Sequence, residues 1–130
     1  MSGERGTVLV VDDSAFVRKK VTEALAGAGF GAVEAADGVE ALAVLARHEV
    51  VLVITDFLMP KMSGSELISA IREHEPWAQL PVIVLSTVGN GGVVEPGWER
   101  GVTVWLRKPY KPELLVAAAL SLVASPLPVS

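Results

Sequence analysis

The segment 50–56 reads Val-Val-Leu-Val-Ile-Thr-Asp, and it decides the fold class of this chain. A nearly unbroken run of Val, Ile and Leu is typical of a strand that is covered on both faces, as in a parallel sheet. Two further runs, Thr7–Val11 and Pro81–Leu85, have the same character. Because Asp56 follows directly on segment 50–55, we expect its carboxylate at the end of a buried strand.

Helical patterns alternate with these strand candidates. Two weaker runs, Ala32–Ala35 and Val102–Leu106, complete the set of predicted strands. The first two helices are predicted at Ala15–Ala28 and, with Asp37 as its cap, at Gly38–Arg47. The other two are predicted from the cap Ser63 to about Glu73 and from Lys111-Pro112-Glu113 to about residue 124. Strands that alternate with helices form βαβ units with right-handed crossovers. The sequence therefore predicts an α/β fold, doubly wound around a five-stranded parallel sheet.

The segment between the fourth and fifth predicted strands is a poor helix former. Between Gly89 and Gly101 stand five glycines and one proline, Pro96. An interior glycine costs about 1 kcal/mol relative to alanine and an interior proline about 3 kcal/mol. We expect the helix of this segment to be weak, missing, or reduced to about one turn near Pro96–Arg100.

Length and composition restrict the class of protein. The 130 residues suit a single domain, with its core at about residues 7–124, and 51% hydrophobic against 20% charged residues allows a proper core. A net charge of −4 argues against nucleic-acid binding, and the absence of cysteine excludes disulfides and thiolate metal sites. The longest uncharged apolar stretch, Leu114–Ala124, is shorter than the ~20 residues of a membrane span. We expect a cytoplasmic protein without membrane or nucleic-acid partners.

Residues with reactive side chains follow four of the predicted strands. They are Asp12-Asp13, Asp56, Ser86-Thr87 and Lys108. Ligands of such sheets bind beyond the carboxyl ends of the strands, so these side chains are expected to meet there. Three neighbouring carboxylates are tolerable only with raised pKa values or a bound cation. Oxygen ligands without His or Cys favour Mg²⁺ over zinc.

These residues, in this order, resemble the response-regulator receiver family of two-component signalling, which has the CheY-like fold. The matching segments are Val10–Ser14, Asp56–Gly64, Val84–Thr87 and Lys108-Pro109, and the resemblance covers about residues 7–124. The spacings suit the family without insertion. The resemblance implies the strand order 2-1-3-4-5.

The resemblance also implies roles for the acidic residues. Asp56 would be the nucleophile that accepts a phosphoryl group. Asp12 and Asp13 would bind Mg²⁺, Asp13 more directly, and Asp56 and the backbone carbonyl of Leu58 would complete the protein ligands. Taken singly, either of the first two aspartates could instead cap a helix.

The remaining site residues are assigned by the same resemblance. Lys108 and Ser86 would contact phosphoryl oxygens, and Thr87 and Leu58 would flank the acyl phosphate. Thr87 replaces the alanine or glycine usual in the family, so its branched side chain is expected to narrow access. Trp105 stands where the family often has a Tyr or Phe switch, and its bulk is expected to hinder rotation.

The function implied is that of a signalling switch rather than an enzyme, since the domain catalyses only its own phosphorylation and dephosphorylation. A histidine kinase or phosphotransfer domain would donate the phosphoryl group, and a downstream protein target would bind the changed surface. The alternative is a pseudo-receiver that serves as an interaction or dimerisation module without phosphorylation. A phosphohydrolase of the haloacid-dehalogenase type would need Asp-x-Asp where this chain has Asp12-Asp13-Ser14, and an FMN-binding flavodoxin would need a phosphate loop after the first strand.

The last predicted helix is apolar all round. No charged residue follows Glu113, and Leu114, Leu115, Val116, Leu120, Leu122 and Val123 exceed one helical stripe. Exposed apolar surface of this kind marks an interface. We expect a homodimer or a docked partner at this helix.

Overall fold

In the computed structural model the described residues are 4–57, 59, 61–87 and 104–124. They form a five-stranded, all-parallel sheet in the order β2-β1-β3-β4-β5, which confirms the predicted fold class and strand order. The strands are β1 (Thr7–Val11), β2 (Gly31–Ala35), β3 (Leu52–Asp56), β4 (Val82–Ser86) and β5 (Val104–Arg107).

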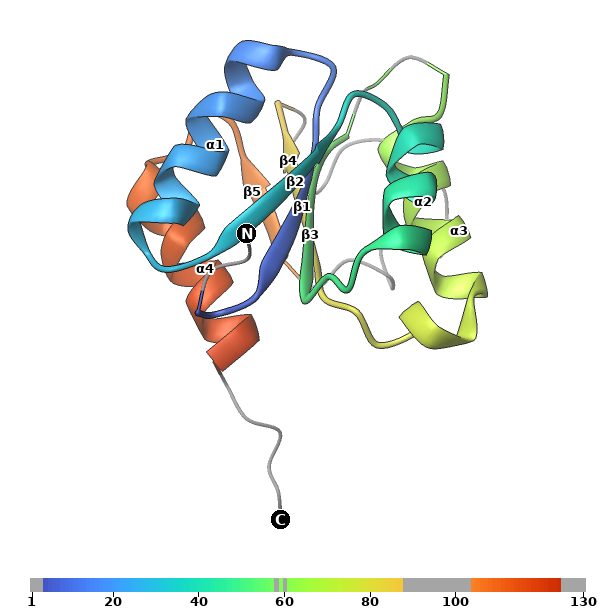
Figure 1. Ribbon diagram of the computed structural model, residues 1–130. Helices are drawn as coiled ribbons and strands as arrows, with labels where there is room; N and C mark the ends of the chain where they lie inside the picture. Colours follow the sequence, from blue (N-terminus) through green and yellow to red (C-terminus); the bar gives the residue numbers. More distant parts are fainter. Residues whose placement is uncertain (1–3, 58, 60, 88–103, 125–130) are drawn as a thin grey trace.

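Two layers of helices enclose the sheet. Helices α1 (Ala15–Gly27) and α4 (Pro112–Ala124) cover one face, and α2 (Gly38–Arg47) and α3 (Gly64–Glu73) cover the other (Figure 1). A short 3₁₀ turn at Glu75–Trp77, which the sequence patterns did not predict, follows α3. Among the described residues, no helix is long and apolar enough to cross a membrane.

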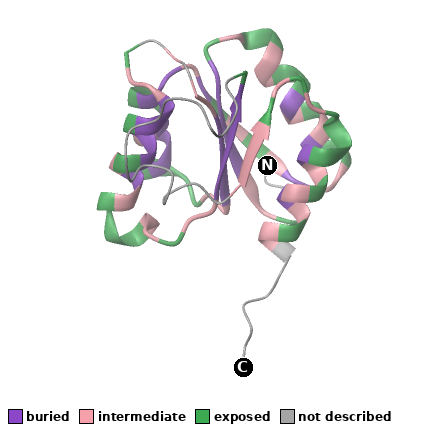
Figure 2. Cartoon of the chain, turned by 180° about the vertical axis from the view of Figure 1, so that it is seen from behind, coloured by how far each residue is buried: buried purple, intermediate pink, exposed green. Residues whose placement is uncertain are grey.

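The core lies on both faces of the sheet, and the central strands separate its halves. Residues of β1, β3 and β4 are almost wholly buried, whereas the outer strands β2 and β5 are partly exposed (Figure 2). One apolar cluster joins the sheet to α2 and α3, and the other joins it to α1 and α4. This double burial explains why the central strands are continuous Val, Ile and Leu.

The helix starts agree with the capping residues in the sequence. The Asp37 side chain accepts from the Glu40 amide at the start of α2. Ser63 and Glu66 form a reciprocal capping box at the start of α3. Helix α1 is capped by Ser14, whose hydroxyl accepts from Val17. Such caps satisfy amides that have no partner within the helix.

The third, fourth and fifth strands each end one residue later than predicted. Asp56 pairs with Leu85 in the ladder and Ser86 pairs with Arg107, so both polar residues are the last paired members of their strands. Pairing, rather than apolar character, sets these ends. The β3 strand also starts at Leu52 rather than at the predicted Val50, because its pairing with β1 begins at Leu52. The weak helix predicted at 89–101 lies outside the described residues.

Candidate functional site

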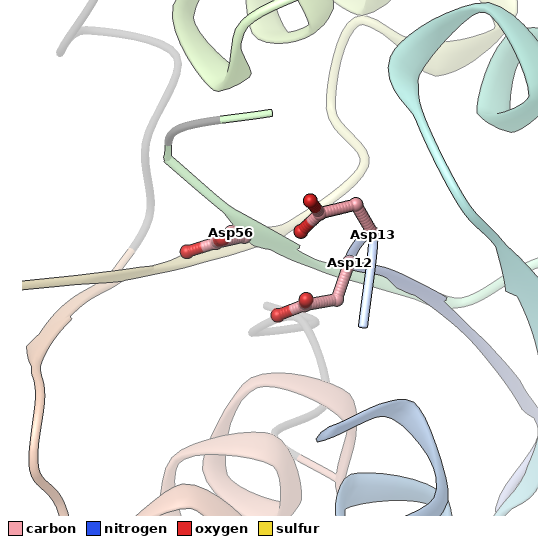
Figure 3. Close-up of side chains that lie close together, drawn as sticks. All are labelled: Asp12, Asp13 and Asp56. Atoms are coloured by element: carbon pink, nitrogen blue, oxygen red, sulfur yellow. The ribbon is translucent and has the colours of Figure 1, made fainter. Parts of the chain in front are cut away.

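Three carboxylates meet where β1 and β3 end. Asp12 and Asp13 follow β1 and Asp56 ends β3, and one oxygen of each lies within 4.8 Å of one oxygen of the others. Figure 3 shows their carboxylates projecting to the same side of these strand ends. The β1 and β3 strands are hydrogen-bonded neighbours in the sheet, so this convergence follows from the topology.

Lys108 brings a positive charge to this group. Its Nζ lies 3.0 Å from Asp56 Oδ1 and 4.0 Å from Asp12 Oδ2. Its backbone amide donates to the Ser86 carbonyl at 2.6 Å, just beyond the pairing of β4 with β5. The sheet therefore holds the lysine backbone, while the side chain, 26% exposed, reaches the carboxylates.

Asp12 is the most buried of the three acidic residues. Its side chain is 5% exposed, and Oδ1 accepts from the Ser14 amide at 2.9 Å. Oδ2 is buried without a hydrogen-bond partner among the described residues. Burial raises the pKa of Asp12 above its ordinary value, and the charge of Asp56 raises it further, against the lowering effect of the Ser14 amide and Lys108.

The Asp56 carboxylate is oriented by two donors. The amide of Phe57 and Nζ of Lys108 both donate to Oδ1, each at 3.0 Å. Behind it, the Gly64 amide donates to the Phe57 carbonyl at 2.8 Å, so the chain passes close to the acid. A Cβ on Gly64 would lie 2.7 Å from the Asp56 carbonyl oxygen. Only glycine allows this approach.

Ser86 and Thr87 follow one another at the end of β4 but differ in exposure. Ser86 is 1% exposed, whereas Thr87 is exposed. Thr87 lines a surface hollow of about 490 Å³ together with Phe16, Lys108 and Tyr110. The narrowing of access by Thr87 stays a prediction.

Trp105 lies on β5 and is half-buried in the apolar cluster beside α2 and α3. Its ring centroid is 5.7 Å from that of Phe57, at an interplanar angle of 45°. The proposed switch residue thus contacts the residue that follows Asp56. The Leu58 carbonyl, expected to complete the metal ligands, lies outside the described residues.

Three residues at the site were not identified from the sequence. Arg18 donates to the Asp12 carbonyl, Gly64 packs behind Asp56, and burial together with the charges of Asp12 and Asp56 raises the pKa of the half-buried Tyr110. The sequence contains only a weak indication of Arg18. It is a cation in the helix that follows Asp12-Asp13, one turn after the cap Ser14. Gly64 ends the matching segment Asp56–Gly64, but the sequence did not show that it packs against Asp56, and nothing in the pattern distinguished Tyr110.

Comparisons with known proteins identify the family. A family model described as the response regulator receiver domain matches residues 8–120, and the chain belongs to this family. It is 36% identical over 110 residues to a chemotaxis protein CheY homolog of Campylobacter jejuni, covering 83% of this chain and 85% of that protein. The receiver domain is a signalling switch, which agrees with the resemblance inferred from the strand-end residues.

Two further similarities, to a transcriptional regulatory protein and to a solved structure, extend the comparison. The chain is 33% identical to the phosphate regulon transcriptional regulatory protein PhoB of Pseudomonas aeruginosa, over 85% of this chain but only 48% of that protein. Its fold is similar to a solved structure of the chemotaxis response regulator CheY4 of Vibrio cholerae, with a TM-score of 0.77 and 33% identity, covering 90% of this chain and 98% of that one.

Proposed function

We propose that this chain is a phosphorylation-controlled switch that accepts a phosphoryl group on Asp56 from a histidine kinase or phosphotransfer domain. The observation that carries the proposal is the position of Asp56, with Lys108 Nζ at 3.0 Å and two further carboxylates close by. Three carboxylates gathered around one lysine repel each other, and this repulsion lowers the stability of the fold. Such a group is therefore better explained by function than by stability. Family membership supports the same function.

The hydrogen bonds of Asp56 support Oδ2 as the attacking atom. Oδ1 of Asp56 already accepts two hydrogen bonds, whereas Oδ2 has no hydrogen bond with any described residue. Oδ2 would form the new bond to phosphorus, and the bond from phosphorus to the donor's leaving group would break, with its electron pair leaving on that group. The Lys108 ammonium, released from Oδ1, would then pair with a phosphoryl oxygen, and the Ser86 hydroxyl would donate to another.

The acidic residues fit a divalent cation with a preference for oxygen ligands. Oδ2 of Asp12 is buried and lacks a hydrogen-bond partner among the described residues, and Asp13 and Asp56 supply oxygens within 4.8 Å. Asp12, Asp13, Asp56 and the Leu58 carbonyl would hold Mg²⁺. Mg²⁺ bound there would neutralise charge on the carboxylate and on the incoming phosphoryl group. Thr87 and Leu58 would border the product.

Phosphorylation would be transmitted to partners through the surface near Trp105. The contact between its ring and Phe57 joins β5 to the residue next to Asp56. A downstream protein target would read the changed surface. The outer face of α4, where Leu114 is 55% exposed, would serve as a contact for a second copy of the chain.

The proposal is tested by mass spectrometry after incubation with Mg²⁺ and acetyl phosphate or phosphoramidate. We expect a gain of one phosphoryl group on Asp56, lost in Asp56→Asn and on chelation of the metal. The exposed Glu23→Gln on α1 serves as the control and should label as the wild type does. A wild type that stays unlabelled would favour the pseudo-receiver alternative, and undiminished labelling of Asp56→Asn would refute the assignment of the acceptor.

A further inference from the structure

We propose that Arg18 is a positioning residue for the metal site, because its guanidinium holds the peptide between Asp12 and Asp13. The inference rests on the proposed function, since it concerns how the same acidic group is arranged to bind a divalent cation. It assigns a role to a residue outside the carboxylates and the lysine.

The contacts of Arg18 connect the residue that follows β1 with β2. Its Nη1 donates to the Asp12 carbonyl at 2.6 Å, and its Nε donates to Oε1 of Glu34 at 2.8 Å. The Arg18 side chain is 17% exposed, although it starts from a surface helix, and Glu34 on β2 is 46% exposed. The N–H donors of a guanidinium lie in one rigid plane. The Glu34 carboxylate, which accepts from Nε, therefore also orients Nη1 toward the Asp12 carbonyl.

The Asp12 carbonyl belongs to the peptide that leads into Asp13, and this makes the contact important. Asp12 itself is held elsewhere, because its amide donates to the Ala35 carbonyl at 3.1 Å and its Oδ1 accepts from Ser14. Asp13 is exposed, and its side chain makes no hydrogen bond or ion pair with another described residue. The direction of its carboxylate therefore depends on the backbone, and Arg18 holds the peptide plane from which that backbone continues.

Charge and position predict opposite effects when Arg18 is replaced. A positive charge near an acidic site repels a cation, so removal of the charge alone would strengthen Mg²⁺ binding. If the guanidinium positions the Asp12–Asp13 peptide, its removal would weaken binding, because the carboxylates would no longer be pre-arranged. Residues that orient metal ligands typically contribute 10- to 100-fold to metal affinity.

The test measures Mg²⁺ binding by isothermal titration calorimetry on the full chain, without a phosphoryl donor. We expect Arg18→Met, which keeps the aliphatic part of the side chain, to raise the dissociation constant by roughly tenfold. Lys19→Met is the matched control, because it removes the same charge from the next, exposed position of α1. Its dissociation constant should stay the same or fall slightly. Glu34→Gln keeps an acceptor oxygen and should remain near wild type, whereas Glu34→Ala should weaken binding less than Arg18→Met.

The outcomes separate this inference from the proposed function. Unchanged or tighter Mg²⁺ binding by a folded Arg18→Met would overturn the positioning role alone. Absence of Mg²⁺ binding by the wild type would overturn the metal site and the inference with it. If circular dichroism shows that Arg18→Met does not fold, Glu34→Ala decides, since it removes only the exposed anchor of the guanidinium. Wild-type affinity in that variant would then overturn the role.

Discussion

Replacing Asp12 with Asn should stabilise the metal-free protein. Its carboxylate is nearly buried, and its Oδ2 has no hydrogen-bond partner among the described residues. The substitution removes a charge that Asp13 and Asp56 repel, and it keeps an oxygen to accept from the Ser14 amide. The new amide nitrogen could donate to the Asp56 carboxylate. Because asparagine has nearly the same shape as aspartate but no charge, the substitution relieves the repulsion.

The magnitude follows from the distances. At an effective dielectric constant of about 20, two carboxylate charges at the 4.8 Å upper limit of their oxygen separation repel by about 3.5 kcal/mol, and Lys108 at 4.0 Å attracts Asp12 by about 4 kcal/mol. Two repulsions thus exceed one attraction. Screening of the exposed Asp13 reduces this difference of about 3 kcal/mol, whereas relief of the burial cost of the Asp12 charge adds to the gain. We expect a net gain of about 1–3 kcal/mol, or an increase in Tm of roughly 4–12 °C for a domain of this size.

The pH dependence has a definite sign. Because the pKa of Asp12 is raised above 3.8 in the folded state, folding favours its protonated form. The stability of the wild type should fall as the pH rises from 3.8 through the raised pKa of Asp12. The difference in Tm between Asp12→Asn and the wild type should therefore shrink as the pH is lowered toward 4. Asp37 is the opposite case, since the Glu40 amide and Lys61 lower its pKa. The charge of Asp37 stabilises the fold above 3.8, and Asp37→Asn should not raise the Tm.

The assay is thermal unfolding followed by circular dichroism, with chelator and at low ionic strength. Addition of Mg²⁺ should reverse the order at neutral pH, because the wild type gains binding free energy and Asp12→Asn lacks a ligand. A Tm of metal-free Asp12→Asn at or below the wild-type value at pH 7 would refute the repulsion argument. Asp37→Asn controls for the loss of an acidic charge elsewhere.

Two other predictions concern packing and assembly. Gly64→Ala should lower the free energy of unfolding in urea by about 1–3 kcal/mol, because its Cβ would lie 2.7 Å from the Asp56 carbonyl oxygen. Gly27→Ala on α1, whose Cβ would have nothing within 4 Å, should leave this free energy unchanged or raise it. Equal losses in both variants would contradict the argument from close approach. Light scattering at high concentration should detect a dimer that Leu114→Lys on α4 abolishes, since this leucine is 55% exposed. A strictly monomeric wild type would count against that interface.

Much of the fold was predictable because burial on both faces leaves a clear pattern. The β1 bounds and the whole of α2 agree with the sequence expectation, and Asp37 and Ser63 cap the helices that they were expected to cap. Strand ends were less predictable. Asp56 is polar and yet belongs to β3, because backbone pairing with β4 continues through it.

Sequence alone predicted the convergence of the three carboxylates and the lysine at the site. Asp12, Asp13, Asp56 and Lys108 each follow or end a strand, and parallel strands place such residues at one edge of the sheet. Their convergence in the structure agrees with that prediction. Their chemical roles stay proposals until phosphorylation and Mg²⁺ binding are measured.

The sequence by itself determined the fold class, the strand-end residues and, with them, the family. Only the tertiary structure decided which neighbours support the site. Arg18 contacts Asp12, which follows β1, and Glu34 of β2, and Gly64 packs against the backbone of Asp56 and Phe57. Periodicity reports whether a position is buried, and this is a property of one segment. The partner of a guanidinium, or the space beside a glycine, depends on how separate segments are placed together, which no single segment encodes.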